Sequence, residues 1–79
     1  MNKTIFDKRY KTMINSLVSI REKQGISQRE LANKLGRVHS YLGRIETFER
    51  RLDVVDLINI SRALGLKDKE ILKLFGKLL

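Results

Sequence analysis

The fold is decided by residues 25–46, which read GISQRELANKLGRVHSYLGRIE. Ser27 and Glu30 have the spacing of a capping box, in which each side chain bonds the backbone amide of the other residue, so a helix begins here. Ala32 is small enough for a second helix to approach it closely. Gly36 can supply the positive φ that a short connection demands. These features predict two short helices that cross steeply over a tight turn.

The second of these helices is predicted to span about residues 39–46. Four apolar side chains are expected to hold the pair against the rest of the chain: Leu31, Leu35, Leu42 and Ile45. Such a unit holds its second helix firmly and leaves one face of it exposed, as insertion into a groove requires. An ordinary helical hairpin contains the same small residues, so Ala32 and Gly36 alone do not identify a function.

Apolar residues also recur at helical spacing on both sides of this stretch. From about Asp7 to Lys23, a helix capped by Asp7 carries an apolar stripe of Tyr10, Met13, Ile14, Leu17 and Val18. Asp53 is a favourable N-cap for a further helix, whose inward side we expect to consist of Val54, Leu57, Ile60, Ser61 and Leu64. A last helix begins at about Asp68 and carries Ile71, Leu72, Leu74, Phe75, Leu78 and Leu79.

Glycines punctuate these segments. Gly25, Gly36 and Gly65 each follow a helical stretch, where a residue in the left-handed conformation is favoured. No alternating run of polar and apolar residues is long enough to form a sheet. We therefore predict an all-α fold, a compact bundle of five helices, with residues 1–79 as a single domain.

The composition excludes several classes of protein. There is no cysteine, which excludes disulfides and thiolate metal sites, and the one histidine, His39, cannot hold zinc alone. No apolar run approaches the roughly 20 residues of a membrane span, and Met1 to Thr4 lack the apolar core of a signal peptide. The sequence has no nucleophile–base constellation and no phosphate-cradling loop. We expect a soluble, cytoplasmic protein that is not an enzyme and uses no cofactor.

The charge indicates a polyanionic partner. Seventeen Lys and Arg against nine Asp and Glu give a net charge of +8. Residues 1–20 have four basic and one acidic residue, residues 21–51 have eight and four, and residues 52–79 have five and four. The excess therefore lies in the first two-thirds of the chain. Nucleic acid, an acidic protein or a merely soluble basic surface fits this pattern, whereas cations spread over several helices disfavour a membrane-binding helix.

Several stretches together resemble the lambda-repressor-like, Xre-type helix-turn-helix family. The similarity is carried by residues 25–36 and by SYLGRIE at 40–46, and it continues in ERRLD at 49–53 and SRALGL at 61–66. It covers roughly residues 17–66. The resemblance implies a five-helix, lambda-repressor-like DNA-binding domain, usually a homodimer on a palindromic operator. Its second short helix would then read the major groove of double-stranded DNA.

Two residues near the ends of this recognition helix depart from the family pattern. Val38 stands where the family usually has Ser or Thr, so the start of the helix lacks a side-chain acceptor. Phe48 stands where the family prefers glycine. A left-handed Phe48 would cost about 1–2 kcal/mol, and the alternative is a different local turn. His39 and Gly43 also differ from a close subset of the family, which affects the expected operator more than the fold.

The resemblance also suggests which side chains meet DNA. Gln28, at the N-terminus of the helix that precedes the recognition helix, is expected to meet a phosphate, with a solvated surface position as the alternative. His39, Ser40 and Arg44 occupy the outward face of the recognition helix. His39 and Arg44 are expected to reach base edges, and Ser40 a base or a phosphate. Arg44 can fork onto O6 and N7 of guanine, and a phosphate contact is its main alternative.

Further contacts are expected beside the recognition helix. Arg37, Arg50 and Arg51 lie in the flanking turn and loop, where phosphate binding is the expected role and a solvated run of charges is the alternative. Glu49 weakens the local positive field. Tyr41 either packs beneath the helix or places its hydroxyl on a phosphate, and we favour the phosphate.

Other residues are expected to set orientation and assembly. Arg21 and Glu46 match a pair that forms a salt bridge in the family, which would orient the recognition helix more than it would stabilise the fold. Apolar residues in the C-terminal part exceed what one bundle face can bury, and we therefore expect a homodimer through Val55, Ile58, Leu74, Leu78 and Leu79.

The sequence thus favours a sequence-specific transcriptional regulator, and a repressor over an activator. A restriction-modification controller protein has the same size and fold. An antitoxin or protein-binding adaptor with a helix-turn-helix fold is the alternative from a different class, since the long first helix and the apolar last helix offer surfaces for a protein partner.

Overall fold

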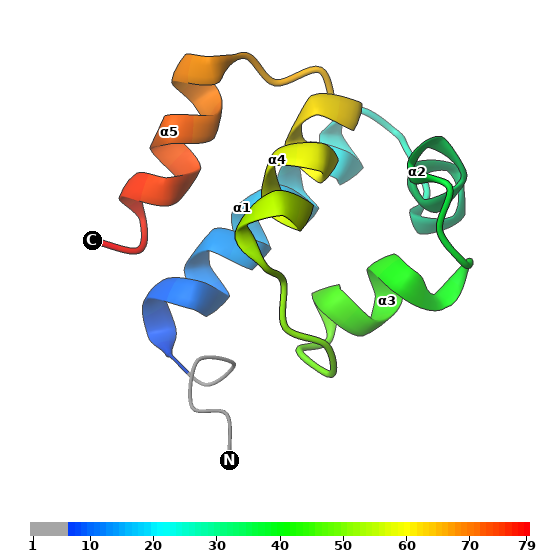
Figure 1. The fold of residues 1–79 in the computed structure, drawn as a ribbon, viewed down its shortest axis with the longest axis horizontal. Coiled ribbons are helices and arrows are strands. Elements are labelled where there is room, and N and C mark those ends of the chain that lie inside the picture. Colours follow the sequence, from blue (N-terminus) through cyan, green and yellow to red (C-terminus); the bar gives the residue numbers. More distant parts are fainter. Residues whose placement is uncertain (1–6) are drawn as a thin grey trace.

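The computed structural model describes residues 7–79 of the chain. In this range the chain forms five helices: α1 (Lys8–Lys23), α2 (Gln28–Leu35), α3 (Ser40–Glu46), α4 (Val54–Ala63) and α5 (Asp68–Gly76) (Figure 1). No strand occurs within residues 7–79, which confirms the predicted all-α fold of five helices. None of these helices has both the length and the apolarity that crossing a membrane requires. Met1 to Thr4 lie outside the described residues.

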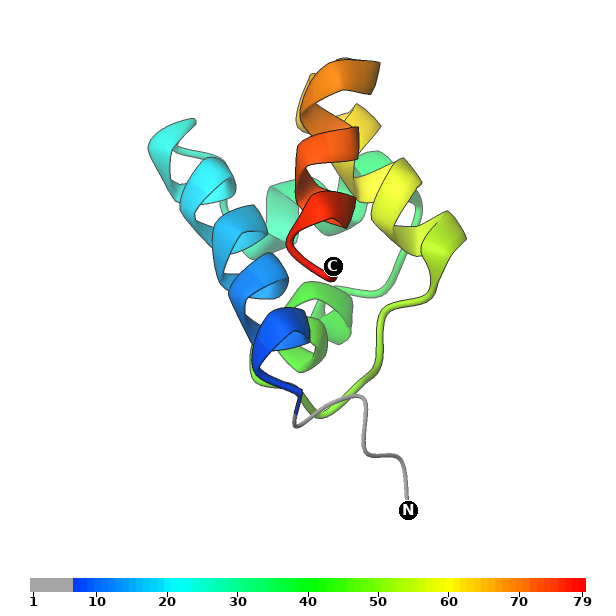
Figure 2. The ribbon, with the colours of Figure 1, turned by 90° about the vertical axis from the view of Figure 1, so that its left-hand side faces the viewer.

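α1 and α4 lie at the centre of the fold, with α2 and α3 on one side of them and α5 on the other (Figures 1 and 2). α2 packs against both α3 and α4, and α3 also packs against α1, so the α2–α3 unit is held from two directions. α5 packs against α1. Figures 1 and 2 show α5 on the side of α1 and α4 opposite to α2 and α3. The unit predicted from residues 25–46 therefore occupies one side of the molecule, where α3 can present its outer face.

Side chains cap the starts of three helices at the predicted residues. Asp7 accepts a hydrogen bond from the backbone amide two residues later, at 2.8 Å. Ser27 and Glu30 form the predicted capping box, with bonds of 3.0 and 3.1 Å. Asp53 accepts from the amide of Asp56 at 2.7 Å. These bonds satisfy amides that the first helical turn leaves without a partner.

The start of α3 is different. The helix begins at Ser40, one residue later than predicted, and its N-cap is His39 and not Val38. The His39 side chain makes no capping hydrogen bond, in line with the missing acceptor noted in the sequence. An isolated helix of this length is not stable in water. The seven-residue α3 therefore depends on contacts with the rest of the protein.

The end of α3 is closed by Phe48 in the left-handed conformation, with φ at 64°. The amides of Phe48 and Glu49 donate to the carbonyls of Ile45 and Arg44, at 3.1 and 2.8 Å, as in a Schellman motif that normally has glycine. The Phe48 ring meets the Tyr10 ring edge-on, with centroids 6.5 Å apart. This packing offsets the unfavourable φ and decides between the two turns that the sequence left open.

The core follows the predicted stripes with a few corrections. Most of the expected inward residues are buried, but Val18 and Leu35 are only partly buried. Val54 is 59% exposed, because it is the first residue of α4 and burial along that helix starts only at Asp56. Leu74, which we expected on a dimer surface, is 3% exposed within the protein's own core.

Ser61 provides a test of this packing. It is fully buried, and its hydroxyl has no hydrogen-bond partner among the described residues. A buried hydroxyl without a partner is unfavourable, and alanine favours the helix, so Ser61→Ala should raise the free energy of unfolding by about 1 kcal/mol. Urea denaturation measures this. Ser16→Ala is the control, because the Ser16 hydroxyl already donates to the Thr12 carbonyl. Destabilisation by Ser61→Ala would mean that the hydroxyl is satisfied in solution.

Candidate nucleic-acid interface

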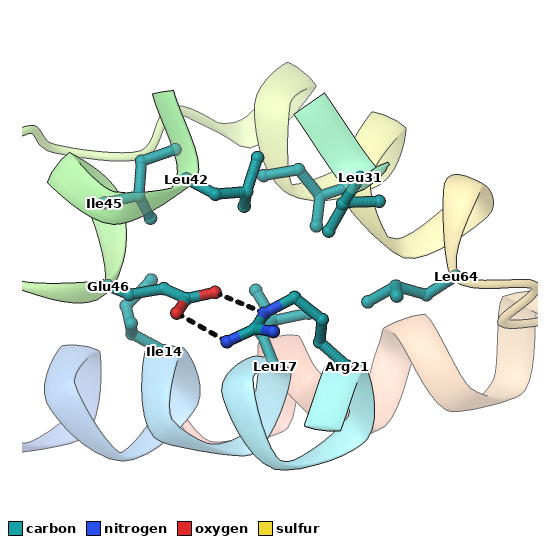
Figure 3. A pocket seen from close by; sticks show the side chains of 9 residues that line it. Ile14, Leu17, Arg21, Leu31, Leu42, Ile45, Glu46 and Leu64 are labelled. Carbon is teal, nitrogen blue, oxygen red and sulfur yellow. Dashed lines mark hydrogen bonds and ion pairs between the residues drawn. The ribbon is translucent and has the colours of Figure 1, made fainter. Parts of the chain in front are cut away.

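Arg21, in the last turn of α1, and Glu46, the last residue of α3, form a bidentate ion pair (Figure 3). Nε of Arg21 donates to Oε2 of Glu46 at 2.8 Å, and Nη2 donates to Oε1 at 2.9 Å. The two side chains are only 10% and 11% exposed. The remaining Nη1 donates to the carbonyl of Ile26 at 2.8 Å, so Arg21 also fixes the turn before α2. The salt bridge expected from the family resemblance is therefore present.

The surroundings of this pair are apolar. Figure 3 shows it enclosed by Ile14, Leu17, Leu31, Leu42, Ile45 and Leu64, which come from α1, α2, α3 and the end of α4. The hydrogen bonds to Glu46 raise the pKa of Arg21 above its usual value, against the opposing effect of burial. Each buried charge is thus bonded to the opposite charge. Such a pair is satisfied in one arrangement only, and it sets the orientation of α3 relative to α1.

Gln28 is the third member of this cluster. Its Nε2 donates to Oε1 of Glu46 at 2.8 Å, and the residue is half-buried. A Cβ on Gly43 would lie 3.4 Å from Oε1 of Gln28, so the two residues are close neighbours across α2 and α3. The sequence suggested a surface glutamine free to meet a phosphate. In the structure the Gln28 amide is instead bonded within the protein.

The outward face of α3 carries the side chains expected to read bases. His39, Ser40 and Arg44 are all exposed, whereas Leu42 and Ile45 on the other face are each 2% exposed. Ser40 and Arg44 are four residues apart and share one side of the helix. The structure therefore brings Ser40 and Arg44 together on one accessible surface, and it leaves His39, the N-cap residue, exposed at the start of the helix.

Tyr41 lies inside and not on this surface. It is 4% exposed, and the guanidinium carbons of Arg37 and Arg50 each lie 4.9 Å from the centroid of its ring. Burial, followed by the Asp56 carboxylate near its hydroxyl, raises the pKa of Tyr41 to about 12. Of the two positions considered from the sequence, the structure thus has the packed one. Arg37, Arg50 and Arg51 are exposed beside α3, as expected.

Sequence reasoning missed the part played by Asp56. This residue is 5% exposed, and its Oδ1 lies 3.5 Å from Nη2 of Arg37. It is also the third residue of α4, where its Oδ2 accepts from the amide of Asp53 at 3.5 Å. The signal was available in the sequence, because Asp53 and Asp56 have the spacing of a capping box. What the spacing does not show is that the same carboxylate meets an arginine near α3.

The chemistry of this region suits a polyanion that has a groove. Exposed guanidinium groups surround α3 at Arg37, Arg44, Arg50 and Arg51, and Ser40 and His39 add shorter polar side chains. Within residues 7–79, no group of three or more His, Cys, Asp or Glu side chains is placed to hold a metal ion. The site therefore offers hydrogen-bond donors and positive charge on a firmly held helix.

Comparisons with known proteins agree with this geometry. Residues 17–72 match a family model described as helix-turn-helix. Among solved structures, the chain is similar to an Xre-family-like protein from Pseudomonas syringae pv. tomato str. DC3000, with 39% sequence identity and a TM-score of 0.79. The similarity covers 94% of each of the two chains. None of the curated proteins matches the chain.

The ion pair generates a prediction about stability. Glu46→Gln leaves the Arg21 charge buried without a counter-charge, and we expect the free energy of unfolding to fall by about 3 kcal/mol. Urea denaturation measures the change, with Glu49→Gln at an exposed site as the control. A double-mutant cycle with Arg21→Gln tests the coupling directly. Additivity of the two changes within about 0.5 kcal/mol would show that the residues are not coupled.

Proposed function

Since the chain belongs to the Xre-type helix-turn-helix family, whose members are DNA-binding transcriptional regulators, we propose that it is a sequence-specific repressor. In this proposal a homodimer binds a palindromic operator, with α3 of each protomer in the major groove. The observation that carries the proposal is the exposed polar surface of α3, formed by Ser40 and Arg44 on the helix and by His39 at its N-cap. The buried Arg21–Glu46 pair holds this helix in place.

Base reading is assigned to the outward side chains of α3. Arg44 can donate two hydrogen bonds to O6 and N7 of guanine, which gives it the largest expected share of the specificity. Ser40 can reach a base or a phosphate, and His39 can donate to or accept from a base edge. The pair that orients α3 supports this role, because base reading requires a helix that docks in one orientation.

Phosphate binding is assigned to the flanks of α3. Arg37, Arg50 and Arg51 are exposed in the turn before α3 and in the loop after it. Guanidinium groups in such places release counterions from the duplex and bind every sequence to a similar degree. The first amides of α2 add a further phosphate contact. Because one N–H of Gln28 Nε2 is bonded to Glu46, its expected phosphate contact would need that bond to be exchanged or the second N–H of Nε2 to reach the phosphate.

The proposed dimer uses a groove between α4 and α5. This groove is lined by Ile58, Arg62, Asp68, Ile71, Leu72 and Phe75. Leu72 is 68% exposed, and Val55 beside the groove on α4 is 63% exposed. α3 contributes nothing to this surface, so a partner bound there leaves the outer face of α3 open.

Repression then requires only that the protein occupies its operator, because a protein bound in the major groove excludes other proteins from the same stretch of DNA. Such a regulator needs no cofactor and would act in the cytoplasm, where it can reach DNA.

The groove between α4 and α5 also fits an alternative function. An apolar surface of this kind also fits a different protein chain, as in an antitoxin or a protein-binding adaptor. Selection of bound duplexes from a random pool separates the two functions. Enrichment of a palindrome supports the regulator, and no enrichment supports the adaptor.

Assembly can be measured directly. We expect a dimer by light scattering at tens of micromolar, with the two recognition helices about 34 Å apart so that both enter one face of the duplex. Leu72→Asp should yield monomers, because it places a charge among the apolar side chains that line the groove. Lys69→Asp is the control, since Lys69 is exposed on the same helix and does not line the groove. A monomeric wild-type protein that binds one chain per site would remove the dimer from the proposal.

Two arginine substitutions distinguish residues that recognise bases from residues that bind phosphates. Arg44→Ala should weaken binding to the selected operator by about 1–3 kcal/mol and relax the preference at one base pair in each half-site. Arg51→Ala should weaken binding to all duplexes alike and reduce the slope of log K against log salt by about one. Titrations at several salt concentrations on matched and mismatched duplexes give both quantities. The reverse pattern would mean that another face of the protein meets DNA.

A further inference from the structure

The Tyr41 ring contacts two arginines, one from each end of α3. Arg37 belongs to the turn before the helix and Arg50 to the loop after it. Their guanidinium carbons nevertheless lie at the same distance, 4.9 Å, from the centroid of the Tyr41 ring. The ring itself is 4% exposed. A buried aromatic ring is therefore in contact with two cations whose charged groups remain at the surface.

A buried carboxylate supports one of these arginines. Oδ1 of Asp56 lies 3.5 Å from Nη2 of Arg37, and the Asp56 side chain is 7% exposed against 46% for Arg37. The group of Arg37, Arg50 and Asp56 thus has two positive charges and one negative charge. It keeps a net positive charge at the surface, available to an anion.

We infer that Tyr41 is a positioning residue whose ring holds Arg37 and Arg50 together as one preformed site for the phosphates of the DNA backbone. This inference rests on the proposed function and extends it from single arginines to a built site. A guanidinium that stacks on a ring uses its flat face, so the N–H groups at its edge stay free to donate to phosphate oxygens. Contact with the ring also restricts the side chain before DNA arrives, which reduces the entropy lost on binding.

The position of the group favours phosphate over bases as its ligand. Arg37 and Arg50 reach the ring from the two flanks of α3, whereas the outward face that would enter the groove carries Arg44. The Tyr41 hydroxyl is not the ligand, because it is buried near Asp56. Tyr41 therefore acts on DNA binding through the arginines and without touching DNA.

Charge-preserving substitutions test the inference. Arg37→Lys and Arg50→Lys retain the positive charge but lack the planar group that stacks on the ring. Each should weaken binding to all duplexes alike, by about 3- to 10-fold, as expected for a lost phosphate contact. Arg51→Lys is the matched reference, because Arg51 is exposed in the same loop and stacks on no ring among the described residues. The losses at Arg37 and Arg50 should exceed the loss at Arg51.

Substitutions of Tyr41 test the ring itself. Tyr41→Phe keeps the ring and Tyr41→Leu removes it, so Tyr41→Leu should weaken binding more, with no change in base preference. In the Tyr41→Leu background, Arg37→Ala should cost less than in the wild type, because the arginine is no longer held. If Tyr41→Leu does not fold, the comparison of lysine substitutions decides the question alone.

The outcomes distinguish this inference from the proposed function. Equal losses from the three Arg→Lys changes, or the same cost of Arg37→Ala with and without the Tyr41 ring, would overturn the positioning role and leave the regulator intact. A wild-type protein that binds no duplex would overturn both. The titrations use the full chain on the selected operator and on an unrelated duplex, at several salt concentrations.

Discussion

The ion pair between Arg21 and Glu46 is the interaction on which the placement of α3 depends. It joins the last turn of α1 to the end of α3 within an apolar enclosure. Arg21 also donates to the carbonyl of Ile26, and Glu46 also accepts from the side-chain amide of Gln28. A buried pair of this kind adds little net stability compared with apolar residues of the same size. However, any other arrangement would leave a buried charge without its partner. The orientation of α3 is therefore determined more sharply than apolar packing alone would determine it.

Both ends of α3 have residues that do not favour a helix end. His39 provides no side-chain cap at the start, and Phe48 takes a left-handed conformation at the end that favours glycine. The deficit at the end of the helix is offset by contacts from distant parts of the chain. The Phe48 ring packs on Tyr10, whose hydroxyl in turn accepts from the amide of Leu52 at 2.9 Å, so α1 holds the loop that follows α3. The helix that we propose to enter DNA is thus a product of the whole fold.

The positive face around α3 is built over two buried carboxylates. Glu46 lies beneath one part of it, bonded to Arg21, and Asp56 lies beneath another, close to Arg37. Each acid satisfies a cation from inside the protein and leaves other cations at the surface. Because Asp56 is also part of the capping box of α4, one side chain links the start of that helix to the flank of α3. The same groups therefore serve both folding and the proposed binding of phosphate.

The sequence by itself determined the features that depend on neighbours along the chain. Helix periods, the caps at Ser27 and Asp53 and the exposed outer face of α3 all follow from spacings of three or four residues, and the structure has them where they were predicted. Only the tertiary structure decided that Gln28 is bonded to Glu46, that Tyr41 is buried against two arginines, and that Leu74 lies in the core. The physical reason is that each of these states depends on residues far apart in the chain, and residue spacing does not specify which distant side chains meet.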